Sequence, residues 1–176
     1  MTDHAQKDFV PSSEGDSLNG FGILIPFVKE LGFVLNYFEN GSSEIIYSPK
    51  PEHFNSFDVA HGGSVMTLLD VSMATAARSV DKTFGIVTIE MKTSFLRPST
   101  GTLKALGTLM HRTRTTAFVQ SSVYNEAGEL CAHSTGTFRY VQRKPHDNSK
   151  SGGTGGESIG ESVGESGIGS QKIATD

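Results

Sequence analysis

The sequence predicts an α+β fold in which one long helix packs against an antiparallel sheet. Residues 62–80 indicate the helix, because they contain no Pro or Gly after Gly63 and are apolar on nearly all sides. A strand hairpin is indicated before this helix, and four further strand-like segments with short turns follow it. A single apolar helix requires a sheet that covers it, which favours the α+β class.

A short helix is expected between residues 21 and 32, because Pro26 suits its first turn and Gly32 suits its end. Asn40-Gly41 is a strong hairpin signal between two of the strands. A loop over residues 55–61 leads into the long helix. The expected strands share a length and polarity pattern typical of a half-buried sheet, and they cover residues 33–39, 44–48, 85–96, 103–111, 117–125 and 129–141.

The last four of these strands are expected to form a meander, in which each strand pairs with the next. In the first of them, strict alternation predicts that Val87, Ile89, Met91 and Phe95 share one face.

Both ends of the chain differ in composition from the middle. Residues 1–20 are polar and without periodicity, so a mobile segment is expected there. Residues 144–176 repeat Gly-Glu-Ser and cannot bury a core, so this tail is expected to be disordered. The predicted folded domain is therefore 21–143.

Charge and cysteine content limit the function classes. Residues 21–143 hold 11 Lys/Arg and 10 Asp/Glu, a near-neutral balance that argues against a nucleic-acid partner. Cys131 is the single cysteine, so no intrachain disulfide can form. No apolar stretch is long enough to span a membrane and the start of the chain does not resemble a signal peptide, so we expect a cytoplasmic protein. No metal-ligand spacing is present.

The motif with the clearest chemical meaning is His61-Gly62-Gly63 followed by Asp70. The first N–H groups of a helix have no partner inside the helix and act as donors. A carboxylate within a buried helix is costly unless it is paired or has a function. Together, a donor cluster and a lone buried acid are suited to the attack of water on an activated carbonyl.

These residues, with Asn55 and the strand that contains Thr88, resemble the hotdog-fold acyl-CoA thioesterases of the PaaI-like or Them2-like type. The resemblance implies a long central helix wrapped by a five- to six-stranded antiparallel sheet. It also implies homodimers with active sites at the dimer interface, which usually pair into tetramers. Relatives often carry Gly three residues before the His, where this chain has Asp58.

The resemblance assigns a role to each residue of the motif. The backbone N–H of Gly62 matches the oxyanion donor, and Asp70 matches the general base or nucleophile. Thr88 matches the hydroxyl that positions water, Asn55 the contact to the leaving group, and His61 the residue that supports the loop.

Each role has a structural alternative. Asp70 could bond a neighbouring backbone group, the glycines could allow tight packing, and Thr88 could be an ordinary strand residue. His61 and Asn55 could cap a helix and a turn.

Helix geometry independently predicts a site shared by two chains. Gly63 and Asp70 are seven residues apart, which is ~10 Å along a helix axis at ~1.5 Å per residue. The Asp side chain leans toward the N-terminus and recovers ~2–3 Å. The remaining ~7 Å is too long for two groups acting on one thioester carbon. Two antiparallel helices about a twofold axis would bring donor and acid from different chains together.

The expected substrate is an acyl-CoA thioester, with no separate cofactor. Gly63 is expected to contact substrate, and Arg112 and Arg114 could hold CoA phosphates or form a solvated turn. Met66, Met73 and Phe95 are candidates for lining the acyl tunnel. Two alternatives remain open, namely a hotdog dehydratase or hydratase, which needs a His paired with an acid, and a non-enzymatic acyl-CoA-binding module.

Overall fold

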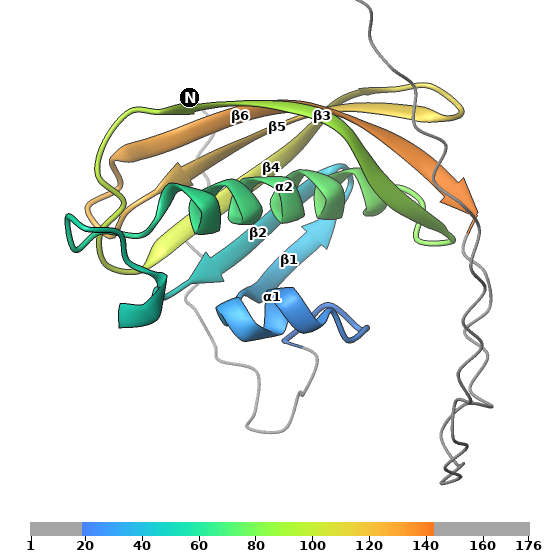
Figure 1. Ribbon diagram of the computed structural model, residues 1–176. Coiled ribbons are helices and arrows are strands. Elements are labelled where there is room, and N and C mark those ends of the chain that lie inside the picture. Colours follow the sequence, from blue (N-terminus) through green and yellow to red (C-terminus); the bar gives the residue numbers. More distant parts are fainter. Residues whose placement is uncertain (1–18, 143–176) are drawn as a thin grey trace, which may run out of the picture. The chain divides into compact units, whose positions relative to one another are not determined.

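A long helix lies across the concave face of a six-stranded antiparallel sheet (Figure 1). The computed structural model describes residues 19–142, so the predicted mobile segment (apart from Asn19 and Gly20) and the predicted disordered tail lie outside the described residues. The elements follow in the order α1 (Pro26–Leu31), β1 (Val34–Glu39), β2 (Ser42–Tyr47), η1 (Pro51–His53), α2 (Gly62–Arg78), β3 (Phe84–Phe95), β4 (Leu103–Arg112), β5 (Thr116–Tyr124) and β6 (Leu130–Gln142). The predicted fold class is confirmed.

Local signals in the sequence place the first elements as expected. Pro26 occupies the first turn of α1, and Gly32 ends that helix with a φ of 74°. Asn40 and Gly41 have φ values of 50° and 79°. Positive φ at both central residues is what a type I′ turn requires, so the β1–β2 hairpin forms where it was predicted.

The strand order differs from the predicted meander. The order is β1-β2-β4-β5-β6-β3, so β4, β5 and β6 form a meander, whereas β3 pairs with β6 at one edge. The N–H groups of Leu96 and Arg97 both donate to the carbonyl of Cys131, and Ala60 N–H donates to the carbonyl of Ser99. These bonds hold the segment after β3 at the end of the sheet, so the chain crosses to the other side of β5 and β6 before β4 begins.

A β-bulge in β3 overturns the prediction that Val87, Ile89, Met91 and Phe95 share one face. Thr88 pairs with Phe138, and the register then shifts so that Met91 pairs with Gly136. An extra residue reverses the alternation of side chains along a strand. Even-numbered residues therefore face α2 before the bulge, and odd-numbered residues face it after the bulge. Thr88 and Met91 consequently lie on the same, helix-facing side, and Val87 points away from the helix.

The core lies between α2 and the concave face of the sheet. Its largest fully buried side chains come from the residue before β1 and from β2, α2, β4, β5 and β6, and they include Phe33, Tyr47, Ile45, Leu68, Leu69, Met73, Leu103, Val119 and Phe138. A polar contact lies at the centre of this layer, where the Ser43 hydroxyl donates to the carbonyl of Ser72 at 2.8 Å. Gly107 lies beneath that contact, because a Cβ there would be 2.6 Å from Ser43 Oγ. The glycine thus sets how closely α2 approaches the sheet.

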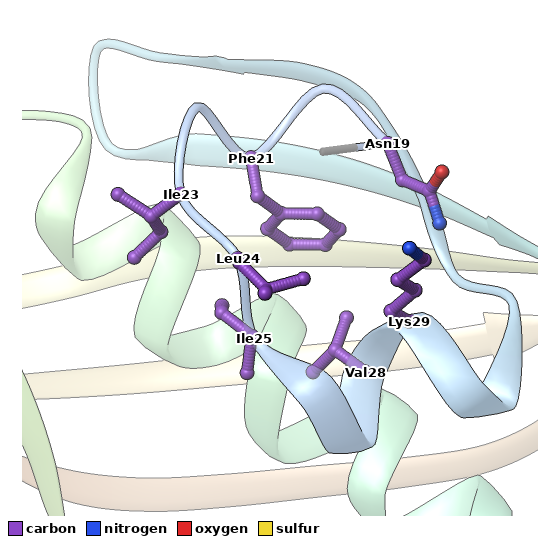
Figure 2. A pocket seen from close by; sticks show the side chains of 7 residues that line it. All are labelled: Asn19, Phe21, Ile23, Leu24, Ile25, Val28 and Lys29. Carbon is purple, nitrogen blue, oxygen red and sulfur yellow. The ribbon is translucent and has the colours of Figure 1, made fainter. Parts of the chain in front are cut away.

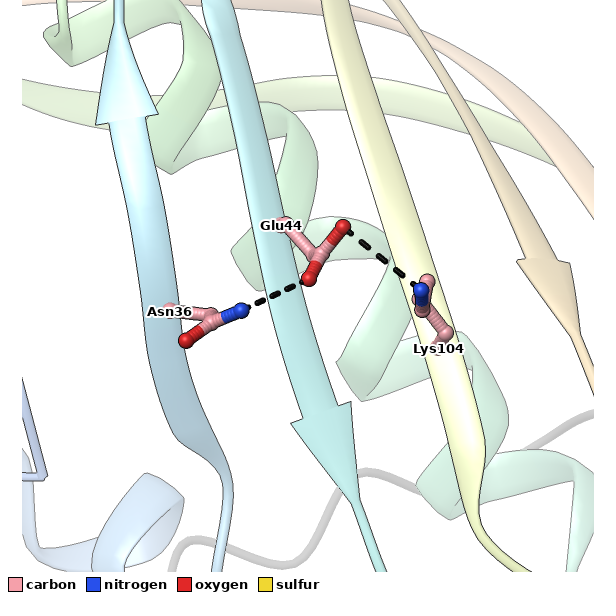
Figure 3. A network of polar contacts seen from close by, with 3 residues as sticks. All are labelled: Asn36, Glu44 and Lys104. Carbon is pink, nitrogen blue, oxygen red and sulfur yellow. Dashed lines mark hydrogen bonds and ion pairs between the residues drawn. The ribbon is translucent and has the colours of Figure 1, made fainter. Parts of the chain in front are cut away.

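On the outer face of the sheet a network of three polar side chains links β1, β2 and β4 (Figure 3). Asn36 Nδ2 donates to Glu44 Oε1 at 2.8 Å, and Lys104 Nζ lies 3.9 Å from Glu44 Oε2. Exposed pairs of this kind contribute little to stability. These polar side chains lie on the face of the sheet that points away from α2. The candidate site lies on the helix side.

Candidate active site

The N-terminus of α2 is capped by a histidine side chain. Gly63 N–H donates to His61 Nδ1 at 2.9 Å, and Ser64 N–H and Val65 N–H donate to the carbonyl of His61. Within residues 19–142, the N–H of Gly62 has no acceptor. The sequence offered two glycine donors, and the cap leaves only that of Gly62 available for a ligand. In this structure the His61 side chain therefore acts as a helix cap.

The Phe95 ring lies beside Gly62. A Cβ placed on Gly62 would lie 3.4 Å from Cζ of the Phe95 ring. A side chain at position 62 would therefore be in van der Waals contact with the aromatic ring at the end of β3.

Asp70 and Thr88 meet across α2 and β3. The Thr88 hydroxyl donates to Asp70 Oδ1 at 2.8 Å. Burial raises the pKa of the Asp70 carboxyl, and the hydrogen bond from Thr88 opposes part of that increase. Within the described residues Asp70 has no cationic partner. A half-buried carboxylate with one hydroxyl donor and no counter-charge is a stronger base than an exposed aspartate.

An open groove of about 570 Å³ contains this pair. It runs along the exposed face of α2, and its walls come from α1 and the residue before it, from α2 and from β3. The lining residues are Ile25, Phe27, Val28, Gly63, Met66, Thr67, Asp70, Val71, Thr88 and Met91. Three of the predicted site residues, Gly63, Asp70 and Thr88, therefore lie in one groove.

The predicted lining is only partly correct. Met66 lines the groove, as predicted. Met73 is fully buried, because its methyl group packs against the backbone of β6 at Gly136. Phe95 lies over Gly62 and not along the groove. Ile25, Phe27 and Val28 were not predicted to line it, since three apolar residues at the start of a six-residue helix give no readable periodicity.

The loop before α2 is held by Asn55. Its Oδ1 accepts from Phe57 N–H at 2.8 Å and from Val59 N–H at 3.5 Å. Two backbone donors fix the orientation of this amide, so its NH₂ group points away from them and is a donor for other partners. Asn55 does not line the groove of its own chain.

Asp58, at the position where relatives often carry Gly, has a positive φ. Its φ is 56°, in the left-handed region that glycine adopts most readily. Asp is among the residues that tolerate this conformation. Asp58 therefore adopts a backbone conformation that Gly would also allow.

Arg112 and Arg114 lie at the other end of α2. The guanidinium of Arg112 stacks over the Tyr140 ring at 4.9 Å from its centroid, and Tyr140 Oη donates to the carbonyl of Ala77. Arg114 is exposed in the β4–β5 turn. The structure does not bring either arginine into the groove of its own chain.

Residues 19–142 contain neither a metal-binding cluster nor a membrane-spanning helix. Between Asn19 and Gln142, no group of three His, Cys, Asp or Glu side chains is placed to hold a metal ion. None of the helices in this part of the chain is long and apolar enough to cross a membrane.

Comparison with known proteins identifies related proteins and a related family. Residues 57–132 match the family model described as Thioesterase superfamily, a segment that contains His61, Asp70 and Thr88. The domain has the hotdog fold of that superfamily. The resemblance drawn from the sequence is confirmed, and the superfamily supports thioester or ester hydrolysis as the general activity of this hotdog domain.

Individual relatives cover the same part of the chain. A protein of Thermoplasma acidophilum named "Putative esterase Ta0293" is 25% identical over 131 residues, which is 74% of this chain and 98% of that protein. The PaaI protein of the E. coli phenylacetic acid degradation operon superposes with a TM-score of 0.62 at 22% identity, covering 65% of this chain and 83% of its own. The thioesterase HI1161 of Haemophilus influenzae gives a TM-score of 0.62 at 22% identity, over 69% and 86% of the two chains. At these identities the two solved structures establish the fold of the hotdog domain.

Proposed function

We propose that the protein hydrolyses acyl-CoA thioesters to a free acid and CoA, with Asp70 as the general base or nucleophile. The observation that supports this most directly is the half-buried Asp70 carboxylate in an apolar groove, bonded to Thr88 Oγ1 at 2.8 Å and without a counter-ion among the described residues. Such a carboxylate is positioned to accept a proton from water or to attack an acyl carbon.

The proposed steps use few groups. The Gly62 N–H polarises the thioester carbonyl at the positive end of α2. Asp70 removes a proton from water, the water oxygen bonds to the acyl carbon, and the carbon–sulfur bond breaks. A CoA thiol has a pKa near ~8.5, so its thiolate leaves with little assistance and takes up the proton afterwards. If Asp70 attacks directly, the intermediate is an anhydride that water then cleaves.

We also propose that each site combines groups from two chains. The free donor at Gly62 and the carboxylate of Asp70 lie two turns apart on one helix. β3 ends the sheet, and its exposed apolar residues include Val87 and Ile89. A long unpaired edge of this kind is suited to pair with another chain. Antiparallel pairing of two β3 edges would place Gly62 of the partner subunit near Asp70. Pairing of dimers into tetramers stays a prediction.

Mixed dimers test the shared site. Asp70→Asn removes the carboxylate, and Gly62→Pro removes the donor N–H. In a heterodimer one site carries both changes and the other carries neither, so activity should return to half of a wild-type dimer. Heterodimers that form but remain inactive would show that both groups serve one chain's own site.

Thiol release tests the activity itself. Wild-type protein should release free CoA from at least one of acetyl-, octanoyl-, palmitoyl- and phenylacetyl-CoA. Saturable binding of all four without thiol release would instead indicate an acyl-CoA-binding module.

A hydratase would add water to an enoyl-CoA. That reaction is disfavoured here because His61 Nδ1 accepts the Gly63 N–H and no acid pairs with this side chain within the described residues.

Arg112 and Arg114 are proposed to contact CoA phosphates, because guanidinium groups suit phosphate geometry. Replacing both by Ala should raise KM for acyl-CoA and leave KM for an acyl-pantetheine thioester unchanged.

The proposed reaction needs no cofactor besides the acyl-CoA substrate. The cytoplasmic location stays a prediction.

A further inference from the structure

We propose that Phe27 is a specificity-determining residue that selects uncharged, apolar acyl groups over short or negatively charged ones. The inference rests on the proposed thioesterase function, because it assigns the apolar wall of the Asp70 groove to the acyl chain. Three observations support it: the position of Phe27, the apolar and uncharged lining of the groove, and the volume of the groove.

Phe27 is placed outward by a firmly seated helix. Val28 and Leu31 of α1 are buried in the core, whereas Phe27 is 62% exposed. Despite this exposure, its side chain lines the groove that contains Asp70 and Thr88. An aromatic ring held at the rim of an acid-containing groove offers apolar area that only a ligand, or a second chain, can cover.

The lining selects against charge. Apart from Asp70 and Thr88, which bond each other, Thr67 is the remaining polar side chain, and its hydroxyl donates to the carbonyl of Gly63 at 2.9 Å. The residues that line the groove include no Lys, Arg or His. An acyl group ending in a carboxylate would meet an apolar wall and a carboxylate without a compensating cation, which is costly.

The lining also favours chains of some length. Met66 and Met91 are flexible and polarisable, so they adapt to chains of different shape. A volume of about 570 Å³ lies well within the ~300–1,000 Å³ of pockets that bury small organic ligands. An acetyl group would leave most of this surface unused.

The packing behind α1 provides a matched control residue. On its other side the segment borders a separate, small cavity of about 10 Å³, lined by Phe21, Leu24, Ile25 and Val28 among others (Figure 2). A space of this size holds about one water molecule. The segment is therefore closely packed by side chains on this side. Leu24 is 59% exposed, close to the value for Phe27, but it lines this cavity and not the groove.

The experiment compares kcat/KM for three substrates with the full chain. Acetyl-CoA, octanoyl-CoA and octanedioyl-CoA differ in length and in one terminal carboxylate. We expect wild type to favour octanoyl-CoA over both others by about 10-fold or more. Phe27→Ala should lower kcat/KM for octanoyl-CoA about 10-fold, the loss expected when an apolar side chain no longer covers a ligand, and change acetyl-CoA less than about twofold. Leu24→Ala should leave the octanoyl-to-acetyl ratio unchanged.

A second variant provides a gain of function. Phe27→Lys places a cation at the rim and should raise the octanedioyl-to-octanoyl ratio at least about 10-fold above that of wild type. Equal losses on all substrates in Phe27→Ala, or the same ratio change in Leu24→Ala, would overturn the inference while leaving the thioesterase proposal intact. Failure of wild type to release thiol from any acyl-CoA would overturn the proposed function, and this inference with it.

Discussion

Replacing Gly107 by Ala tests how the fold positions α2. A Cβ at this position would lie 2.6 Å from Ser43 Oγ, 2.6 Å from the carbonyl oxygen of Ser72 and 2.7 Å from Ser72 Oγ. Non-bonded heavy atoms prefer about 3.5–4.0 Å, so the strand and helix must separate by about 1 Å. Overpacking of this kind costs about 1–3 kcal/mol, and the Ser43–Ser72 hydrogen bond is worth about 1 kcal/mol more.

The expected total loss for Gly107→Ala is about 2–4 kcal/mol in the free energy of unfolding, which lowers Tm by about 8–16 °C for a domain of this size. Thermal unfolding followed by circular dichroism measures the change. Thr108→Ala, at the next residue on the exposed face of β4, is the control and should stay within about 2 °C of wild type. If Gly107→Ala also unfolds within about 2 °C of wild type, α2 does not approach the sheet as closely as described.

Three further predictions concern the site. His61→Asn should keep a side-chain acceptor for the helix N-terminus and retain more activity and stability than His61→Leu, which loses the cap; equal loss in both would point to a chemical role for the imidazole. Thr88→Ser should retain activity, whereas Thr88→Val should lower kcat and shift the acid limb of the pH–rate profile to higher pH, because the hydroxyl that lowers the pKa of Asp70 is gone. Burial raises the pKa of Asp70 above its unfolded value, so its contribution to stability is lost as pH rises through the folded pKa. Asp70→Asn should therefore unfold at a higher temperature than wild type at pH 7, with a difference that shrinks in acid; a lower Tm at pH 7 would contradict this.

The sequence was sufficient for the elements whose signals are local. The long helix, the hairpin at Asn40-Gly41 and the α1 boundaries at Pro26 and Gly32 follow from propensity, positive φ and capping. The predicted helix extended two residues too far, to Val80, because Ser79 and Val80 do not interrupt its apolar pattern whereas the helix ends at Arg78.

The strand order and the β3 bulge could not be predicted in the same way. Both depend on which backbone groups pair, and side-chain alternation carries no information on that choice. The bulge falls in Thr88-Ile89-Glu90, which contains no Gly to mark it. Its consequence is that Thr88 and Met91 face the same groove. A strict alternation would have separated them.

The sequence predicted those site residues that belong to a recognisable motif and lie on the long helix. Asp70 stood out because a lone acid in an apolar helix is costly. The resemblance supplied Thr88 as the hydroxyl that positions water, and the structure places that hydroxyl 2.8 Å from Asp70 Oδ1. The contribution of α1 to the groove was missed, since it depends on how a six-residue helix docks against α2. The helix start alone offered both glycine N–H groups, and the resemblance singled out Gly62 as the donor. The His61 cap, which occupies the Gly63 N–H, supplies a physical reason for that choice.

The most direct test of the account is kcat/KM for acyl-CoA hydrolysis by Asp70→Asn relative to wild type, measured at pH 7 on the best substrate of the panel. Asn is nearly the same size and can still accept from the Thr88 hydroxyl, but it cannot take a proton from water. We expect a loss of about 10²–10⁴-fold with a cooperative unfolding transition retained. A folded Asp70→Asn variant that keeps more than about a tenth of wild-type kcat/KM would contradict the assignment of Asp70 as the catalytic carboxylate.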